Sequence, residues 1–274
     1  MCSQEQLTQY AEEGYVVLSD VYSQDEISEC QREYDAMFER AQKRGNDLEA
    51  TWKGDYSEKK QDSSVLSIHN VQFHSSTFMK MMLNEKLGVA LEQLMDTPNI
   101  QLHHTKAHVK PALKGSPFPT HQDYQYFPHE NHSMIAVMVH LEDAAEVNGC
   151  ICAYPKSHKL GPLPDHGEGK HHYCDQSEYP VAKATPIPVK QGEVLVFPYF
   201  LVHGSYPNKS STPRRILLFQ LREAGDEPTS AIHLSPGMGL MIRGINPAMD
   251  ADINKRHQKD SDDTAAEPSA KRAM

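Results

Sequence analysis

A histidine and a carboxylate stand two residues apart in the segment THQDYQYF, where His121 and Asp123 flank Gln122. Both residue types bind divalent metal ions, and on an extended strand they would point to one face while Gln122 points away. The spacing alone is weak evidence, since 16 His and 37 acidic residues give roughly two such pairs by chance, and the chain repeats it at 140–142 and 166–168. Other residues of the chain therefore have to show whether this pair binds a metal ion.

A third metal ligand has to come from a distant part of the chain. His203, in the segment VHGS at 202–205, follows the apolar run at 194–197 and is the candidate. Two histidines and one carboxylate leave three coordination positions open, as in the facial triad of non-haem Fe(II) oxygenases. The open positions accept an oxidant and a chelating co-substrate. We therefore interpret His121, Asp123 and His203 as an Fe(II) site.

An arginine at the start of the next apolar run fits the far end of such a co-substrate. A dicarboxylic acid that binds iron at one end needs its other carboxylate held, and the guanidinium of Arg214 can do this with two hydrogen bonds while staying charged. The hydroxyl of Ser205 can donate to the same carboxylate. Arg215 competes for this role, but strand alternation puts the two arginines on opposite faces, and the spacing from His203 favours Arg214.

Several other residues have open interpretations. At least one of Tyr124 and Tyr126 is expected at the mouth of a substrate pocket, with packing in an aromatic core as an equal alternative. Lys106 is a weaker candidate for a carboxylate contact. The remaining histidines of interest are interpreted mainly as structural or surface residues, with a substrate contact as the alternative for the last two: His103, His104, His108, His140, His171 and His172.

The N-terminal part is predicted to contain two helices and a short strand. Residues 1–45 read as a helix, the short strand Tyr15–Leu18 and a second helix, which Ser23 and Glu26 open with a capping-box pattern. That helix is expected to run to about Gln42, with four apolar residues at helical spacing: Ile27, Cys30, Tyr34 and Met37.

Residues 46–98 are predicted to form three further elements. The polar stretch 46–64 is expected to be a surface loop, and 65–73 alternates like a strand. Ser75 or Ser76 is expected to cap one helix, whose apolar stripe consists of Phe78, Met81, Met82, Leu87, Leu91 and Leu94.

From about residue 99 the pattern changes to short strands separated by turns, which is typical of an antiparallel barrel or sandwich. The long stretch 155–183 is interpreted as a lid-like insertion. Together, residues 1–249 are predicted to be one domain, followed by a disordered polar tail at 250–274. The predicted strands are Ile100–Val109, Pro119–Tyr126, Met134–Leu141, Cys150–Tyr154, Thr185–Val189, Val194–Phe197 and Arg215–Leu221.

Composition and charge narrow the class of protein. The 274 residues, 38% of them hydrophobic, suffice for a substantial core. A net charge of −10 argues against nucleic acid or an anionic membrane as the main partner, and no apolar run reaches the ~18 residues of a membrane span. The acidic N-terminus does not resemble a secretory signal, and five irregularly spaced Cys are typical of free thiols. We expect a cytoplasmic protein with a small-molecule substrate.

The same motifs, taken in order, resemble those of a known family. They are HQD at 121–123, NG at 148–149, PKSH at 155–158, HGS at 203–205 with PN at 207–208, and then Arg214. The opening EGYVVL at 13–18, followed by Ser23 and Glu26, agrees with them. From about residue 6 to residue 222 the chain resembles the phytanoyl-CoA dioxygenase family of Fe(II)- and 2-oxoglutarate-dependent hydroxylases.

This resemblance implies a mainly β fold with N-terminal helices, the double-stranded β-helix (jelly roll, cupin-like). It implies Fe(II), 2-oxoglutarate and O2, with iron ligands His121, Asp123 and His203, and with Arg214 and Ser205 at the far carboxylate of 2-oxoglutarate. The expected reaction is hydroxylation of an aliphatic C–H in a metabolite, natural-product intermediate or acyl-thioester, giving succinate and CO2. Halogenases of the family lack the carboxylate ligand, so Asp123 favours hydroxylation. The alternative is a non-catalytic jelly-roll protein that binds a metal or ligand.

Overall fold

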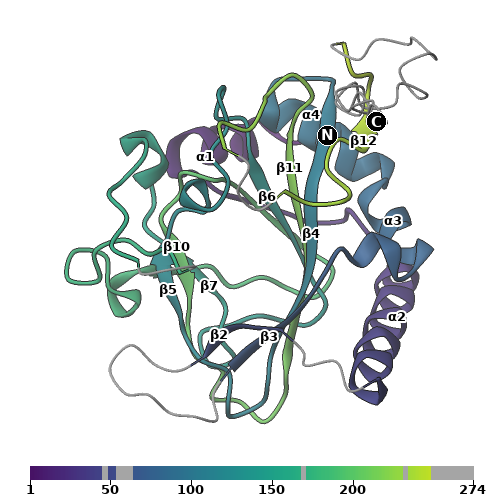
Figure 1. The fold of residues 1–274 in the computed structure, drawn as a ribbon, viewed down its shortest axis with the longest axis vertical. Helices are drawn as coiled ribbons and strands as arrows, with labels where there is room; N and C mark the ends of the chain where they lie inside the picture. Colours follow the sequence, from purple (N-terminus) through teal and green to yellow (C-terminus); the bar gives the residue numbers. More distant parts are fainter. Residues whose placement is uncertain (45–48, 54–63, 168–170, 231–233, 248–274) are drawn as a thin grey trace, which may run out of the picture.

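Two antiparallel sheets carry the residues singled out above. The computed structural model describes residues 1–44, 49–53, 64–167, 171–230 and 234–247 (Figure 1). Within these ranges the larger sheet has eight strands in the order β1-β9-β6-β11-β4-β3-β2, and β12 pairs with one end of β4. The strands are β1 (Val16–Leu18), β2 (Glu49–Lys53), β3 (Ser64–His69), β4 (Ile100–Lys110), β6 (Ile135–His140), β9 (Val194–Pro198), β11 (Arg214–Glu223) and β12 (Met241–Arg243).

The smaller sheet faces the larger one and carries His121, His203 and Ser205. Its order among the described residues is β5-β10-β7-β8. In Figure 1 it lies to the left, away from the helices beside β4. Its strands are β5 (Phe118–His121), β7 (Ile151–Ala153), β8 (Thr185–Pro186) and β10 (His203–Ser205).

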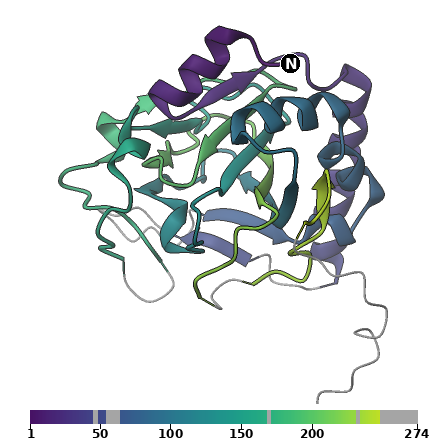
Figure 2. The same ribbon diagram turned by 90° about the horizontal axis from the view of Figure 1, so that it is seen from above.

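Helices cover the outer side of the larger sheet, as the view from above also shows (Figure 2). They are α1 (Gln4–Glu13), α2 (Gln24–Lys43), α3 (Ser76–Met82) and α4 (Glu85–Met95). Four short 3-10 helices lie in the described connections: η1 (Val71–Phe73), η2 (Asp123–Gln125), η3 (Ser157–Leu160) and η4 (Val181–Lys183).

The core has two parts because both faces of the larger sheet carry clusters of buried apolar side chains. On one face, Val137 and Phe219 belong to the cluster that includes the buried residues of α2, α3 and α4. On the other face, Met138 and Leu218 pack in a cluster with Ile151 of the smaller sheet. This two-layer arrangement is the predicted jelly roll with N-terminal helices.

The prediction for the N-terminal part is confirmed in detail at α2. The Ser23 side chain accepts from the backbone N–H of Glu26, and the Glu26 carboxylate accepts from that of Ser23. The buried residues of this helix are the four that the periodicity identified: Ile27, Cys30, Tyr34 and Met37.

Three predictions for residues 46–98 need correction. The stretch expected to be a surface loop contains β2, which pairs with β3, although 54–63 lie outside the described residues. The strand expected over 65–73 ends at His69, because Asn70 has a left-handed backbone (φ 56°) and η1 follows. The single predicted helix is two, since α3 ends at Met82 and Asn84 caps α4.

Most strands predicted after residue 99 are confirmed, with differences at the smaller sheet. The strand expected over 119–126 ends at His121, and the chain then turns into η2. The strand expected over 185–189 is only Thr185–Pro186. β10 and β12 were not predicted, because a strand of three residues is too short to show alternation.

The 155–183 segment runs beside β5 and contains η3 and η4. Gln122 holds it by donating from Nε2 to the Gly161 carbonyl oxygen (2.9 Å) and by accepting from the Leu163 N–H at Oε1 (2.8 Å). Its role as a mobile lid stays a prediction, as does the single domain over 1–249. The tail at 250–274 lies outside the described residues.

Candidate metal and co-substrate site

A cavity of about 440 Å³ lies between the two sheets. Its lining includes His121, Asp123 and His203 at one place and Arg214 with Ser205 at another. Residues from distant parts of the sequence thus meet in one pocket. Its volume is in the usual range for small-molecule sites.

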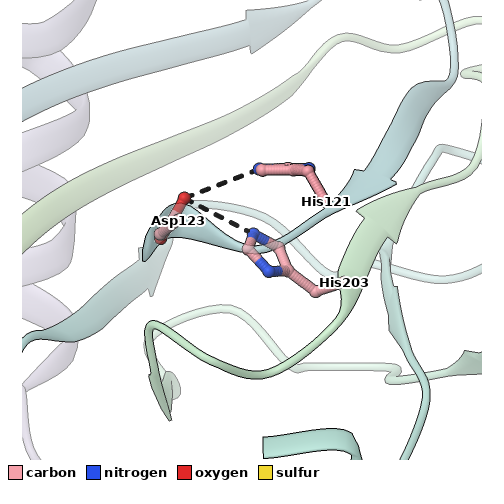
Figure 3. A group of neighbouring side chains, drawn as sticks. All are labelled: His121, Asp123 and His203. Carbon is pink, nitrogen blue, oxygen red and sulfur yellow. Dashed lines mark ion pairs between the residues drawn. The ribbon is translucent and has the colours of Figure 1, made fainter. Parts of the chain in front are cut away.

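Two histidines and one carboxylate form a compact group in this cavity (Figure 3). The Asp123 Oδ1 atom lies 3.5 Å from His121 Nε2 and 3.9 Å from His203 Nε2. The three donor atoms lie within 4.8 Å of one another, and all three residues are buried. They are the one group of this kind among the described residues.

Strand pairing explains how the group is assembled. β5 and β10 pair antiparallel with His121 directly opposite His203, and residues that face each other across two strands have neighbouring side chains. Asp123 reaches the group differently from the prediction, because it begins η2 rather than continuing the strand. Gln122 points away from the group, as expected, and donates to the Phe200 carbonyl oxygen at 2.6 Å.

Backbone carbonyls set the orientation of both imidazoles. His121 Nδ1 lies 2.8 Å from the Pro119 carbonyl oxygen, and His203 Nδ1 lies 3.0 Å from that of Leu201. A carbonyl oxygen only accepts, so each Nδ1 carries the hydrogen and each Nε2 presents a lone pair to the centre.

Gln220 of β11 fixes the carboxylate. Its Nε2 donates to Asp123 Oδ2 at 2.6 Å, which leaves Oδ1 directed at the two histidines. Burial alone would raise the pKa of Asp123, but the charges of His203 and His121 and the hydrogen bond from Gln220 lower it. Burial, followed by the charge of His121, lowers the pKa of His203 to about 4. At pH 7 the group therefore has an anionic oxygen and a neutral His203.

Arg214 faces the cavity with its guanidinium largely unsatisfied. The side chain is 2% exposed, and its Nε and Nη1 atoms have no hydrogen-bond partner among the described residues. Burial lowers its pKa to about 10, so it stays charged at neutral pH. A buried cation with free donors is costly unless an anion binds to it. Ser205, also buried, lines the same cavity.

Arg215 points to the opposite face of β11, as alternation predicted. It forms ion pairs with Asp35 and Glu142. Its donors are therefore used outside the cavity, and Arg214 is the arginine that the fold places next to the cavity.

The two tyrosines that follow His121 and Asp123 in the sequence have different surroundings. Tyr126 lines the cavity, and its ring lies 5.9 Å from that of His121 and perpendicular to it. Tyr124 is not among the lining residues and packs against Tyr199 and Phe200. The pocket interpretation therefore fits Tyr126, and the aromatic-core alternative fits Tyr124.

The sequence did not predict that one set of basic residues lines the cavity together. Four residues of β4 line the cavity at every second position: His104, Lys106, His108 and Lys110. The signal was present as four basic residues with a period of two, but His103, directly before His104, obscured the phase. Gln220 was also missed, although it shares the parity of Arg214 on β11.

These residues suit an Fe(II) ion and a dicarboxylate. Imidazole nitrogen and carboxylate oxygen are donors that non-haem iron takes, and three donors on one side leave open positions. The unsatisfied guanidinium of Arg214 provides the binding group for a distant carboxylate.

Solved structures share this class of fold. ThoJ, a non-haem monooxygenase in its apo form, superposes with a TM-score of 0.71 at 19% identity, over 88% of this chain and 84% of its own. The epimerase SnoN, in complex with Fe3+, alpha ketoglutarate and nogalamycin RO, superposes with a TM-score of 0.68 at 17% identity, over 88% and 98%. At these identities the likeness establishes the jelly-roll fold alone.

Sequence comparison shows to which protein family the chain belongs. The phytanoyl-CoA dioxygenase (PhyH) family model matches residues 10–216, and the chain belongs to this family. A probable alpha-ketoglutarate-dependent hypophosphite dioxygenase of Stutzerimonas stutzeri is 26% identical over 226 residues, which are 78% of this chain and 76% of that protein. The peroxisomal phytanoyl-CoA dioxygenase of Mus musculus is 27% identical over 228 residues, 78% of this chain and 66% of that protein.

Proposed function

We propose that this protein is an Fe(II)- and 2-oxoglutarate-dependent dioxygenase that hydroxylates an aliphatic C–H of a small molecule. His121, Asp123 and His203 hold the iron, and Arg214 with Ser205 holds the far carboxylate of 2-oxoglutarate. The observation that carries this proposal is the meeting of a His-Asp-His group and an unsatisfied buried arginine in one cavity. Family membership and the names of the relatives support it.

The bound iron and co-substrate supply the oxidising chemistry, in which R–H, O2 and 2-oxoglutarate give R–OH, succinate and CO2. The chain's own residues orient the participants. The carbonyls of Pro119 and Leu201 keep both Nε2 atoms directed at the centre, and Gln220 keeps one Asp123 oxygen free. The apolar side chains that line the cavity, among them Met138, limit the access of water to the substrate.

The substrate is proposed to be small rather than a coenzyme A thioester. A thioester of this kind needs basic contacts for its phosphates. Lys170, one candidate in the 155–183 segment, lies outside the described residues, and the other candidates are Lys156 and Lys159. Both form ion pairs with α1 instead, Lys156 with Glu13 at 3.4 Å and Lys159 with Glu12 at 2.6 Å. Tyr126 is proposed to contact the substrate, because it lines the cavity beside His121.

The partners and the cellular location of the protein are also part of the proposal. The net charge of −10 argues against nucleic acid or an anionic membrane as partner, and no helix within the described residues is long and apolar enough to cross a bilayer. The five cysteines are all unpaired, which supports the proposed cytoplasmic location.

Release of CO2 from 2-oxoglutarate labelled at the C1 carboxylate tests the proposal. The Fe(II)-loaded protein is expected to release it in the presence of O2 even without a substrate, since uncoupled turnover needs only the metal and co-substrate. His203→Ala should abolish release, whereas His74→Ala, at an exposed histidine directly after η1, should not. A folded, iron-loaded wild type that releases none would instead indicate a non-catalytic binding protein.

A further inference from the structure

The cavity extends beyond the stretch that the co-substrate of the proposed function spans. Along β11 that stretch runs from Arg214, at the far carboxylate, to Gln220, which holds the metal ligand Asp123. Other lining residues come from the end of β3, from β4, from the segment after η2 and from the C-terminal part of the described chain. We call this part of the cavity the side arm, and its lining includes Asn70, His104, Tyr126, Phe127, Leu234 and Pro236.

The side arm runs across the strands of the larger sheet rather than along them. His104 of β4 stands opposite Gln220 of β11. The Asn70 N–H donates to the carbonyl oxygen of Thr105, the next residue of β4, at 2.9 Å. Neighbouring strands have a fixed spacing, so Asn70 lies two strand spacings, or about 10 Å, from Gln220. The side arm therefore leads away from the co-substrate, starting at the level of the metal ligands.

Aromatic rings form the inner wall of the side arm. The ring of Phe127 lies 5.3 Å from that of His104 and 6.4 Å from that of Tyr126. The Tyr126 ring in turn lies 5.9 Å from that of the metal ligand His121. Burial above all lowers the pKa of His104 well below its ordinary value, so its imidazole is neutral at pH 7. This wall is uncharged from the metal ligand to His104 and suits a hydrocarbon chain.

The C-terminal part of the described chain forms the outer wall. The Gly239 N–H donates to the Leu102 carbonyl oxygen at 2.9 Å, and the Leu102 N–H donates to that of Leu240 at 2.8 Å. These backbone bonds hold the segment beside the start of β4, where Leu234 and Pro236 line the cavity. Leu234 is also 55% exposed, so the outer wall lies at the mouth of the cavity.

Asn70 lines the far end of the side arm. Its backbone is left-handed (φ 56°), a conformation that asparagine adopts more readily than most residues. The Ser235 hydroxyl donates to Asn70 Oδ1 at 2.7 Å and so orients the carboxamide. The Nδ2 atom of Asn70 has no hydrogen bond to any residue that the structure describes. Because an amide nitrogen only donates, this end of the side arm suits an acceptor oxygen.

From this arrangement we propose that the substrate is an uncharged molecule whose carbonyl oxygen accepts from Asn70 and whose hydrocarbon part lies along Phe127 and Leu234. The inference rests on the proposed function and adds the class of substrate to it. An anion would exchange its hydration for one neutral donor group, and a cation would meet N–H donors and the positive charge of iron, so both are disfavoured. The molecule is small, because the cavity of about 440 Å³ also receives 2-oxoglutarate.

Binding of matched uncharged and charged probes tests the inference. The uncharged probes are 2-pentanone, 2-heptanone and 2-nonanone, and the charged probes are the carboxylates and alkylammonium ions with the same alkyl chains. Each is titrated calorimetrically into the Fe(II)- and 2-oxoglutarate-loaded protein without oxygen. At least one ketone should bind about tenfold or more tightly than both charged probes of its chain length.

Substitutions in the side arm identify the contacts. Asn70→Gly accepts the left-handed backbone and should weaken that ketone by about 3- to 10-fold. Asn70→Asp replaces the donors with a carboxylate, so the ketone should weaken and the alkylammonium ion should bind about 3- to 10-fold more tightly. Asp96→Gly, at a residue with φ 51° outside the cavity, is the matched control. Leu234→Ala should weaken the longer ketones, whereas Leu240→Ala, at another exposed leucine of the segment, should not.

Two results would overturn the inference. In one, no ketone binds wild type more tightly than both of its charged counterparts. In the other, Asn70→Gly binds the ketone as tightly as wild type, or weakens 2-oxoglutarate instead, which would assign Asn70 to the co-substrate. Release of CO2 from labelled 2-oxoglutarate is followed in aerated portions of the same samples. If wild type releases none, the proposed function fails; if it does and the ketone preference is absent, only the substrate class is wrong.

Discussion

The side chains that converge on Asp123 are oriented by partners that do not themselves touch the centre of the site. A glutamine of β11 occupies one carboxylate oxygen, and two backbone carbonyls occupy the Nδ1 hydrogens of His121 and His203. Partners of this kind reduce the conformational freedom that a metal ligand loses on binding. Of these three partners, Gln220 acts through its side chain and the other two are backbone carbonyls. Substitution of Gln220 can therefore test its contribution.

Gln220→Leu is expected to weaken Fe(II) binding by about 10- to 100-fold. The leucine removes the donor to Asp123 Oδ2, so the carboxylate can turn away from the histidines. Anaerobic calorimetry with Fe(II) measures the change. Gln101→Leu, at another buried glutamine of the larger sheet, controls for loss of a buried amide. Equal Fe(II) affinities of Gln220→Leu and wild type would show that Asp123 needs no such support.

Among the elements, the approach of β5 to β10 decides whether the two histidines meet. Gly204 lies between His203 and Ser205, and a Cβ at this position would be 2.7 Å from the Phe118 carbonyl oxygen. That distance is shorter than van der Waals contact, and the neighbouring atom is backbone, which cannot rotate away. Glycine, which has no Cβ, therefore permits the close backbone approach of the two strands at position 204.

Gly204→Ala is therefore expected to push β10 from β5 and to separate His203 from His121. We predict weaker Fe(II) binding and a lower free energy of unfolding, by about 1–3 kcal/mol. Metal titration and denaturant unfolding measure the two effects. Gly225→Ala is the matched control, because its Cβ would meet only the end of the Glu223 side chain, at 3.2 Å. An alanine variant at 204 with unchanged metal affinity would contradict this account of the β5–β10 pair.

The elements also show why sequence predicts some parts of this molecule better than others. The helix after Ser23 was predictable because its cap and its periodicity are local signals. β4 was predicted as a strand, but its phase was not, because both of its faces are largely buried and His103 and His104 both lie inside. Alternation shows which residues share a face only where one face is polar and the other apolar.

The site residues were predictable for a different reason. His121, Asp123, His203 and Arg214 were singled out from residue type, motif order and the alternation of expected strands. Gln220 was not found, because a glutamine on an apolar strand has no distinctive chemistry until its partner is known. Its role depends on a hydrogen bond between residues 97 positions apart in the sequence. Such a contact is a property of the fold.

For the molecule as a whole, buried histidines link stability to pH. Burial, followed by the charge of Arg214, lowers the pKa of His140 from 6.5 to about 3. Between these values the unfolded chain takes up a proton that the folded chain does not. The free energy of unfolding therefore falls as the pH falls below about 6.5. His104, His108 and His203 have lowered pKa values too and act in the same direction.

His140→Gln should make this pH dependence shallower. One proton fewer taken up on unfolding lowers the slope by up to about 1.4 kcal/mol per pH unit. Urea unfolding at several values between pH 6.5 and 4.5 measures the slope, which is independent of any constant loss of stability in the variant. His166→Gln, at an exposed histidine, should keep the wild-type slope. Identical slopes for wild type and His140→Gln would contradict the assignment.

One cavity is expected to hold both Fe(II) and 2-oxoglutarate, and anaerobic absorption spectroscopy can detect the two together. Adding 2-oxoglutarate to the Fe(II)-loaded wild type is expected to produce the visible charge-transfer band of the chelate. His203→Ala should give no band, and Arg214→Gln should need about 10- to 100-fold more 2-oxoglutarate for half its intensity. Arg215→Gln, with its ion pairs outside the cavity, should resemble wild type. No band from folded, iron-loaded wild type, or equal effects of the two arginine variants, would contradict the account.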